Sequence, residues 1–238
     1  MIKLTHLKTA WQGTKMAWSG LRLVRDPSKL GEVFAIADAI EGVGQDVLTR
    51  MAVAFRQDPQ GAEALDTRRR LSLPSRAALA AMPVGSVGRA FADYLDRNGI
   101  DPSALPSRPS SDDASFVRAH LYETHDLWHV VTGFETDVAG ELGLQAFYMA
   151  QTEARLAPLL LALGMINTAG QAFDERHQRL DAITRGWMLG KRARPLFGLD
   201  WASRWEQPLT SLRAELALSL DDVDQAVAAP VTTSAWVS

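Results

Sequence analysis

Cysteine is absent from the 238 residues of this chain. Disulfide bonds and thiolate metal sites are therefore excluded, and any metal ion has to bind to nitrogen and oxygen ligands. The absence does not decide the compartment, because a chain without cysteine can fold in an oxidising or in a reducing environment.

The chain also lacks a strong charge of one sign and a long apolar run. Its formal net charge is −3, whereas a domain that binds nucleic acid is typically basic, so we expect no nucleic-acid partner. The most apolar stretch, residues 156–166, is interrupted by Pro158 and Gly164 and is far shorter than the ~20 residues of a membrane-spanning helix. The sequence therefore predicts a protein that does not span a membrane.

Acidic residues are missing from the first 25 positions, and Asp26 is the first acid. Basic side chains and apolar side chains at helical spacing fill this stretch: Lys3, Lys8, Lys15, Arg22 and Arg25, with Leu4, Leu7, Trp11, Trp18 and Leu21. We interpret residues 1–25 as a basic amphipathic helix, which can lie on an anionic membrane surface. An ordinary docked helix or an organelle transit peptide would show the same pattern.

No stretch alternates convincingly between polar and apolar residues, so strands are not expected. Apolar residues recur at spacings of three and four instead, which is typical of an all-α protein. The clearest helix follows Ser86, a good N-cap, and stops at Gly99. Further helices are expected near residues 29–41, 45–56, 112–132, 137–153, 170–189 and 208–217.

The helices are expected to form one domain over residues 26–219. The segment 99–113 contains three prolines and several serines, and we interpret it as a loop within this domain because neither side has enough apolar residues for a core of its own. Residues 220–238 are acidic at first and then small and polar, so we expect a disordered tail.

Histidine is scarce, with five in the chain, yet His125 and His129 lie four residues apart with Asp126 between them. At about 100° per residue, His129 lies about 40° round a helix from His125 and Asp126 about 100° round, so all three can approach one point. Glu141 follows His129 after eleven residues. If the two helices are antiparallel neighbours, Glu141 in the first turn of the second helix faces the histidines.

Two imidazoles and two carboxylates suit Zn, Fe(II) or Mn, whereas Mg is disfavoured by the nitrogen ligands. The pattern alone leaves other interpretations open, such as a core histidine bonded to Asp126 beside an exposed one. A zincin would need Glu at the position of Asp126. A phosphohydrolase of the HD type would need another histidine upstream and an aspartate far downstream, and neither can be assigned here.

The run His125-Asp126-x-x-His129, followed by Glu141, resembles the HDxxH-plus-Glu signature of the coenzyme Q (ubiquinone) biosynthesis protein 4 family. The similarity extends over about residues 20–217. It includes the following residues: Arg25-Asp26-Pro27, Pro83 to Gly88, Gly99 to Pro102, Gly133, Gly140, Gln151-Thr152, Trp187, Gly190 to Ala193, Leu196, Arg204 to Glu206, Leu209, Leu212-Arg213 and Glu215-Leu216.

This resemblance implies an α-helical protein with one divalent metal ion, zinc foremost and iron or manganese as alternatives, on His125, Asp126, His129 and Glu141. It implies an oxidative decarboxylase that removes the ring carboxyl of a prenylated 4-hydroxybenzoate-type precursor with hydroxylation at that carbon. An apolar groove for the prenyl tail, lined from residues 156–166, would complete the site.

The implied partners are the prenylated precursor, a membrane surface, other ubiquinone-synthesis proteins and a second copy of the chain. The implied location is the cytoplasmic face of a bacterial inner membrane or the matrix side of the mitochondrial inner membrane. Two alternatives remain: a prenyl-lipid-binding scaffold without catalysis, whose metal is structural, and a metal-dependent hydrolase of small lipids or phosphates.

Overall fold

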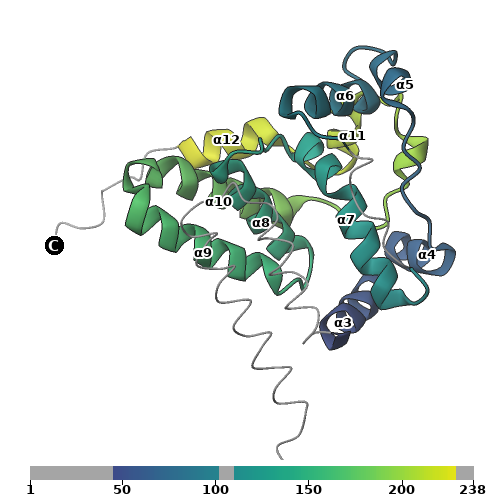
Figure 1. The fold of residues 1–238 in the computed structure, drawn as a ribbon, viewed down its shortest axis with the longest axis horizontal. Coiled ribbons are helices and arrows are strands. Elements are labelled where there is room, and N and C mark those ends of the chain that lie inside the picture. The colour runs from purple at the N-terminus through teal and green to yellow at the C-terminus, as the bar shows by residue number, and fades with distance from the viewer. Residues whose placement is uncertain (1–44, 102–109, 229–238) are drawn as a thin grey trace, which may run out of the picture.

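A computed structural model describes residues 45–101 and 110–228 of the protein (Figure 1). Those residues form helices and no strand, apart from one isolated bridge between Ser86 and Pro208, so the predicted all-α class is confirmed. The α-helices are α3 (Gln45–Phe55), α4 (Pro59–Thr67), α5 (Arg76–Ala80), α6 (Val87–Asn98), α7 (Asp113–Thr132), α8 (Val138–Gln151), α9 (Leu156–Gln171), α10 (Arg176–Arg192), α11 (Leu209–Glu215) and α12 (Leu220–Ala228). Short 3-10 turns, η2 (Phe173–Glu175) and η3 (Trp201–Ser203), precede and follow α10.

The helices predicted from spacing and caps correspond to α3, α6, α7, α8 and α11. Ser86 accepts a hydrogen bond from the backbone N–H of Arg89, and Gly99 closes α6 with a φ of 62°. The predicted helices over residues 1–25 and 29–41 lie outside the described residues.

Pro158 does not interrupt the apolar run, contrary to our interpretation of the sequence. It is the third residue of α9, where a proline is tolerated because the first-turn N–H groups have no partner within the helix. The run 156–166 is therefore continuous helix. The helix expected at residues 170–189 is displaced as well, because α9 ends at Gln171 and α10 begins only at Arg176.

The disordered tail predicted from residue 220 does not hold for its first nine residues, which form α12. This helix packs on α10, and its Val223 is completely buried. The side chain of Arg185 on α10 also pairs with Asp224. The acidic composition therefore marks the exposed side of a docked helix.

Helices α8, α9, α10 and α12 gather at one end of the molecule, with α8 and α10 in closest contact (Figure 1). A Cβ atom added to Gly186 would lie 1.9 Å from the carbonyl oxygen of Gly143, and one added to Gly190 would lie 2.9 Å from that of Phe147. These glycines let the two backbones touch. Because the higher-numbered residues of α8 meet the higher-numbered residues of α10, the two helices run in the same direction.

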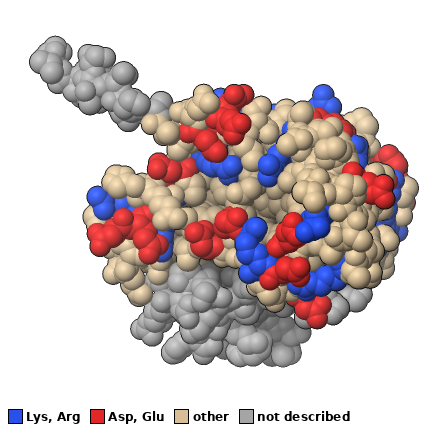
Figure 2. Space-filling view, turned by 90° about the horizontal axis from the view of Figure 1, so that it is seen from above, with Lys and Arg blue, Asp and Glu red and all other residues tan. Residues whose placement is uncertain are grey.

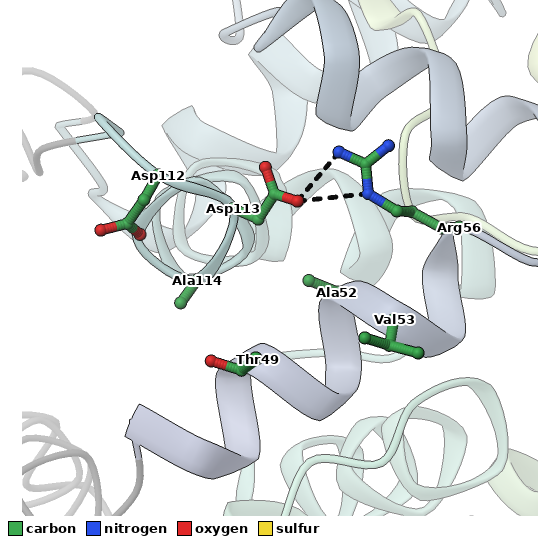
Figure 3. A pocket seen from close by; sticks show the side chains of 7 residues that line it. All are labelled: Thr49, Ala52, Val53, Arg56, Asp112, Asp113 and Ala114. Carbon is green, nitrogen blue, oxygen red and sulfur yellow. Dashed lines mark hydrogen bonds and ion pairs between the residues drawn. The ribbon is translucent and has the colours of Figure 1, made fainter.

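The other end of the molecule contains α3, α4 and the beginning of α7. A cavity of about 260 Å³ lies between α3 and α7 (Figure 3). Ala52 and Val53 of α3 and Ala114 of α7 are among the residues that line it. Arg56 and Asp113 line it as well, and Nη2 of Arg56 lies 2.9 Å from Oδ2 of Asp113. Asp113 is twelve residues before His125 on the same helix, which places this cavity about 18 Å from the candidate metal ligands.

His120 joins the middle of α7 to the turn after α10. It is 3% exposed, lies edge-on to the ring of Phe197, and its Nε2 accepts a hydrogen bond of 3.1 Å from the backbone N–H of Gly198. The ring is therefore neutral with its proton on Nδ1. Burial lowers the pKa of His120 to about 4.

This lowered pKa predicts a loss of stability in mild acid. The unfolded chain takes up a proton at His120 near pH 6.5, whereas the folded protein takes it up only near pH 4, so stability falls between these values by about 3 kcal/mol. Above pH 6.5 the residue is neutral in both states and has no effect on the pH dependence. In His120→Gln the amide oxygen can still accept the hydrogen bond from Gly198. We expect the free energy of unfolding of this variant, measured with urea, to fall less between pH 7 and pH 4.5 than that of the wild type. His177→Gln removes an exposed histidine and is the matched control; an equal effect of both substitutions would contradict the assignment.

Candidate metal centre

The helix that carries both histidines is fixed at its two ends. At its N-terminus Asp112 and Ser115 form a capping box, and at its C-terminus Gly133 adopts a φ of 71°. A left-handed glycine at this position stops a helix and turns the chain. The last turn of α7 is thereby followed directly by the short connection 133–137 to α8.

Two arginines bind the carbonyl groups at the C-terminal end of α7. Arg213 donates from Nε and Nη2 to the carbonyls of Val131 and Val130, each at 2.9 Å, and Arg185 donates from Nη1 to that of Thr132 at 3.1 Å. Burial and then the nearby charge of Arg185 lower the pKa of Arg213. The negative end of the helix dipole favours cations here, and both arginines hold the turn that contains His129.

His129 is the most buried of the candidate ligands, with 1% of its side chain exposed. Its Nδ1–H donates to the carbonyl oxygen of Phe134 at 3.1 Å, which leaves Nε2 with a free lone pair. This nitrogen lies 3.3 Å from Oε1 of Glu141. Burial lowers the pKa of His129, but the side chain of Glu141 and the carbonyl of Phe134 raise it by more than burial lowers it. The pKa of His129 is therefore above its ordinary value.

Glu141 reaches the site because α8 begins immediately after the turn. Asp137 caps α8 by accepting from the backbone N–H of Gly140 at 2.7 Å, and Glu141 follows in the first turn. Gly140 has no room for a side chain: an added Cβ would lie 2.1 Å from the carbonyl oxygen of Glu135. The glycine thus allows the turn to fold back tightly on α8, which directs Glu141 toward the histidines.

His125 completes a group of three potential ligands. One ligand atom from each of His125, His129 and Glu141 lies within 4.8 Å of the others, and the two imidazole rings are 4.9 Å apart. Burial, followed by the neighbouring charge of His129, lowers the pKa of His125, which favours the neutral form that a metal ion binds. Nδ1 of His125 and Nε2 of His129 are both buried without a hydrogen-bond partner.

Asp126, the fourth predicted ligand, lies beside this group and not within it. Its Oδ1 is 3.9 Å from Nδ1 of His125, and its side chain is 23% exposed. The structure thus brings three of the four predicted residues together and leaves Asp126 at the edge. Whether all four are ligands stays a prediction.

Two tyrosines border the candidate centre. The ring of Tyr148 on α8 lies 5.9 Å from the ring of His125 and stacks on Trp128 at 4.3 Å. Tyr94 comes from α6 and stacks on His129 at 5.7 Å, and its buried hydroxyl has no hydrogen-bond partner. Burial is the main cause of the raised pKa of both phenols, which therefore stay protonated. Sequence reasoning missed Tyr94, since a contact between α6 and α7 has no signature in residue spacing.

These groups fit a divalent metal ion on chemical grounds. Two imidazoles and a carboxylate with ligand atoms within 4.8 Å of one another match the nitrogen and oxygen ligands that zinc, iron and manganese accept. Hydrogen bonding of the second imidazole nitrogen to a carbonyl, as in His129, is a common way to orient a histidine ligand. His125 and Glu141 are each about one third exposed, so the centre is accessible from one side.

Comparison with known proteins assigns the chain to a family. The family model described as coenzyme Q (ubiquinone) biosynthesis protein Coq4 matches residues 5–222. The chain belongs to the Coq4 family. Members of this family take part in ubiquinone biosynthesis, and the resemblance recognised in the sequence is confirmed.

The Coq4 relatives cover most of the chain at moderate identity. The mitochondrial ubiquinone biosynthesis protein COQ4 homolog of Mus musculus is 32% identical over 183 residues, which are 75% of this chain and 68% of that protein. A mitochondrial coq4 protein of Sclerotinia sclerotiorum is 32% identical over 193 residues, 76% of this chain and 67% of that protein. A crystal structure from Nostoc punctiforme, of a protein assigned to ubiquinone biosynthesis, has a TM-score of 0.76 at 24% identity, covering 87% of this chain and 98% of that one. At this identity it shows the shared fold.

The tight turn at Gly140 gives a test of how the centre is built. Gly140→Ala forces the carbonyl of Glu135 away, so we expect about 1–3 kcal/mol lower stability and a weakened affinity for zinc, measured by urea unfolding and by competition with a chelating dye. Gly170→Ala is the matched control, because Gly170 is an exposed residue of α9 with no atom within 4 Å of an added Cβ. Alanine there should be neutral or stabilise the protein by up to about 1 kcal/mol. Unchanged zinc affinity in Gly140→Ala would show that Glu141 does not depend on this turn.

Proposed function

We propose that this Coq4 protein holds one divalent metal ion on His125, His129 and Glu141, with Asp126 as a further ligand, and acts on the ring carboxyl of a prenylated 4-hydroxybenzoate-type precursor. The observation that carries this proposal is the convergence of His125, His129 and Glu141, which each bring one ligand atom within 4.8 Å of the others. The net change removes CO₂ and adds a hydroxyl at the same carbon, which requires an oxidant such as O₂. A bound ion would supply Lewis-acid chemistry toward the phenol or carboxylate, and a redox-active ion would also support oxygen chemistry.

The residues of the chain have separate tasks in this proposal. His129 is held by Phe134 and keeps one tautomer, so its Nε2 always faces the centre. The exposed side of His125 and Glu141 is the direction from which the ring would enter. Tyr94 stays protonated beside His129, so its hydroxyl can donate a hydrogen bond to a carboxylate or phenolate oxygen bound in the centre.

A peripheral membrane location fits the proposal, on the cytoplasmic face of a bacterial inner membrane or the matrix side of the mitochondrial inner membrane. Among the described residues, no helix is long and apolar enough to cross a membrane, and the relatives are described as mitochondrial. Acidic and basic side chains are interspersed over the face seen in Figure 2. We place the prenyl tail along α9, whose apolar Ile166 is 56% exposed. Other ubiquinone-synthesis proteins would be partners at the same membrane.

Metal content tests the centre directly. We expect elemental analysis to find about one transition-metal ion per chain in the wild type, and almost none in His129→Ala or Glu141→Ala, because three ligands are needed to retain the ion. Asp126→Asn should lower the affinity for zinc without abolishing binding if Asp126 completes the ligand set. Arg97→Ala, an exposed residue that contacts Glu135, is the control. Wild-type protein that binds no zinc, iron or manganese would refute the metal centre.

Catalysis is separated from a scaffold role by a second experiment. We expect His129→Ala to fail to restore ubiquinone in a strain without its own Coq4 protein, and to accumulate the carboxylated precursor, as measured by mass spectrometry. If the protein is a scaffold with a structural ion, a variant should fail to restore ubiquinone only when that variant is also unfolded. Circular dichroism and the pull-down of other ubiquinone-synthesis proteins by the same variant distinguish these cases. Restoration of ubiquinone by a metal-free, folded variant would exclude catalysis at this centre.

A further inference from the structure

Helix α12 packs on α10 (Figure 1), and its first residue also reaches the connection behind the candidate metal centre. A Cβ atom added to Gly133 would lie 3.3 Å from Cδ1 of Leu220, with which α12 begins. The same Cβ atom would lie 3.6 Å from Nη2 of Arg185 and 3.6 Å from Nη2 of Arg213. The start of α12 and the two arginines therefore surround the glycine that ends α7.

The two arginines bring like charges together, and α12 supplies an acid near each of them. Burial and then the charge of Arg185 lower the pKa of Arg213, whereas the charge of Asp221 raises it. Asp224 pairs directly with Arg185, from Oδ1 to Nε. The two aspartates are three residues apart, so at about 100° per residue they lie about 60° apart on one side of α12. This side of the helix therefore balances the positive charge at the end of α7.

Three contacts hold the guanidinium of Arg185, whose side chain is 16% exposed. Its Nε donates to Asp224, its Nη1 donates to the carbonyl of Thr132 at 3.1 Å, and its Cζ lies 4.6 Å from the centre of the Phe134 ring. A planar cation that stacks on a ring and donates in its own plane has one defined orientation. Asp224 is the charged partner among the three, and hydrogen bonds between charged groups are the stronger ones.

Phe134 links this guanidinium to the candidate ligand His129. The buried ring of Phe134 packs on α8 at Gly143, where an added Cβ would lie 2.4 Å from Cε1 of the ring. The carbonyl oxygen of Phe134 accepts from Nδ1 of His129 at 3.1 Å, which leaves Nε2 to face Glu141. Because the ring contacts both Arg185 and the backbone of α8, it cannot shift without disturbing close packing. The same contacts therefore fix the carbonyl that orients His129.

We propose that Asp224 of α12 is a positioning residue of the candidate metal centre, which acts on His129 through Arg185 and Phe134. This role rests on the proposed function, since it concerns how tightly the centre binds a metal ion. Residues that orient a histidine ligand from behind typically change metal affinity by about 10- to 100-fold. Asp224 is two contacts further from the ligand than Phe134, so we expect its effect at the low end of this range. The segment that we expected to be a disordered tail is thus part of the site.

The alternative is that the ion pair only attaches α12 to α10. The side chain of Asp224 is 51% exposed, and ion pairs that water reaches contribute little to the stability of a fold. Val223 is completely buried, and its apolar contacts attach the helix without the ion pair. The two roles also differ in what they change. Attachment changes the free energy of unfolding, whereas positioning changes the hydrogen bond of His129 and the affinity for the metal ion.

Zinc affinity of the full-length protein, measured by competition with a chelating dye, tests the role of Asp224. We expect the dissociation constant for zinc to rise about 10-fold in Asp224→Asn, because a neutral amide holds the guanidinium of Arg185 less firmly. Asp224→Glu keeps the charge and should recover most of the affinity. The matched control is Asp222→Asn, which removes the same charge from an exposed residue of α12 that points about 160° away from Asp224. Unchanged affinity in Asp224→Asn, or an equal loss in Asp222→Asn, overturns the proposal.

Nitrogen-15 NMR of the metal-free protein distinguishes a failure of this proposal from a failure of the metal centre. The proton on Nδ1 of His129, identified by the loss of its signal in His129→Gln, should exchange with water faster in Asp224→Asn than in the wild type or in Asp222→Asn. If the wild type binds no zinc, the metal centre is refuted, and faster exchange still supports the action of Asp224 on His129. If the wild type binds zinc and the exchange rates are equal, Asp224 has no positioning role and the metal centre stands. A change in urea stability alone assigns Asp224 to the attachment of α12 and likewise overturns the proposal.

Discussion

The geometry of the candidate metal centre depends on the connection 133–137 between α7 and α8. Its glycine ends α7 in a left-handed conformation, the carbonyl of Phe134 holds the imidazole of His129, and the side chain of Asp137 caps α8. The backbone of Glu135 packs so closely on α8 that Gly140 tolerates no side chain. One short segment thus ends the helix with the histidines, orients the buried one and starts the helix with the carboxylate. The three groups therefore come from two helices joined by five residues.

The surroundings of this connection are arranged to keep it rigid. Arg213 and Arg185 approach each other at the end of α7 although their like charges repel, and burial lowers the pKa of Arg213. The carbonyls of the last helical turn offset this cost, because they carry the negative end of the helix dipole and would otherwise lack partners. Arg213 comes from α11 and Arg185 from α10, so helices far apart in the sequence hold the turn that contains His129. Arg185 and Arg213 therefore help to fix the position of His129, although neither is a candidate ligand.

Local signals predicted most of this fold, and contacts between distant segments account for what the sequence did not reveal. The all-α class, the limits of α6 and α7 and the pairing of His125 and His129 with Glu141 follow from caps, spacing and the short connection. The continuity of α9 was missed because Pro158 lies in its first turn. A proline in the first turn is compatible with a helix, whereas a proline further along the chain interrupts one. The docking of α12 depends on Val223 finding a place against α10, and the position of Tyr94 depends on how α6 packs on α7. Neither of these two contacts can be predicted from the spacing of residues along the chain.

The close contact of α8 with α10 supports the candidate metal centre from a second side. Gly143, which follows Glu141 by two residues, touches Gly186 through its carbonyl, and the same pair of helices meets again at Gly190. Backbones in direct contact cannot slide without separating, since no flexible side chain lies between them to adjust. The position of Glu141 is therefore set from both sides, by the turn before α8 and by α10 behind it.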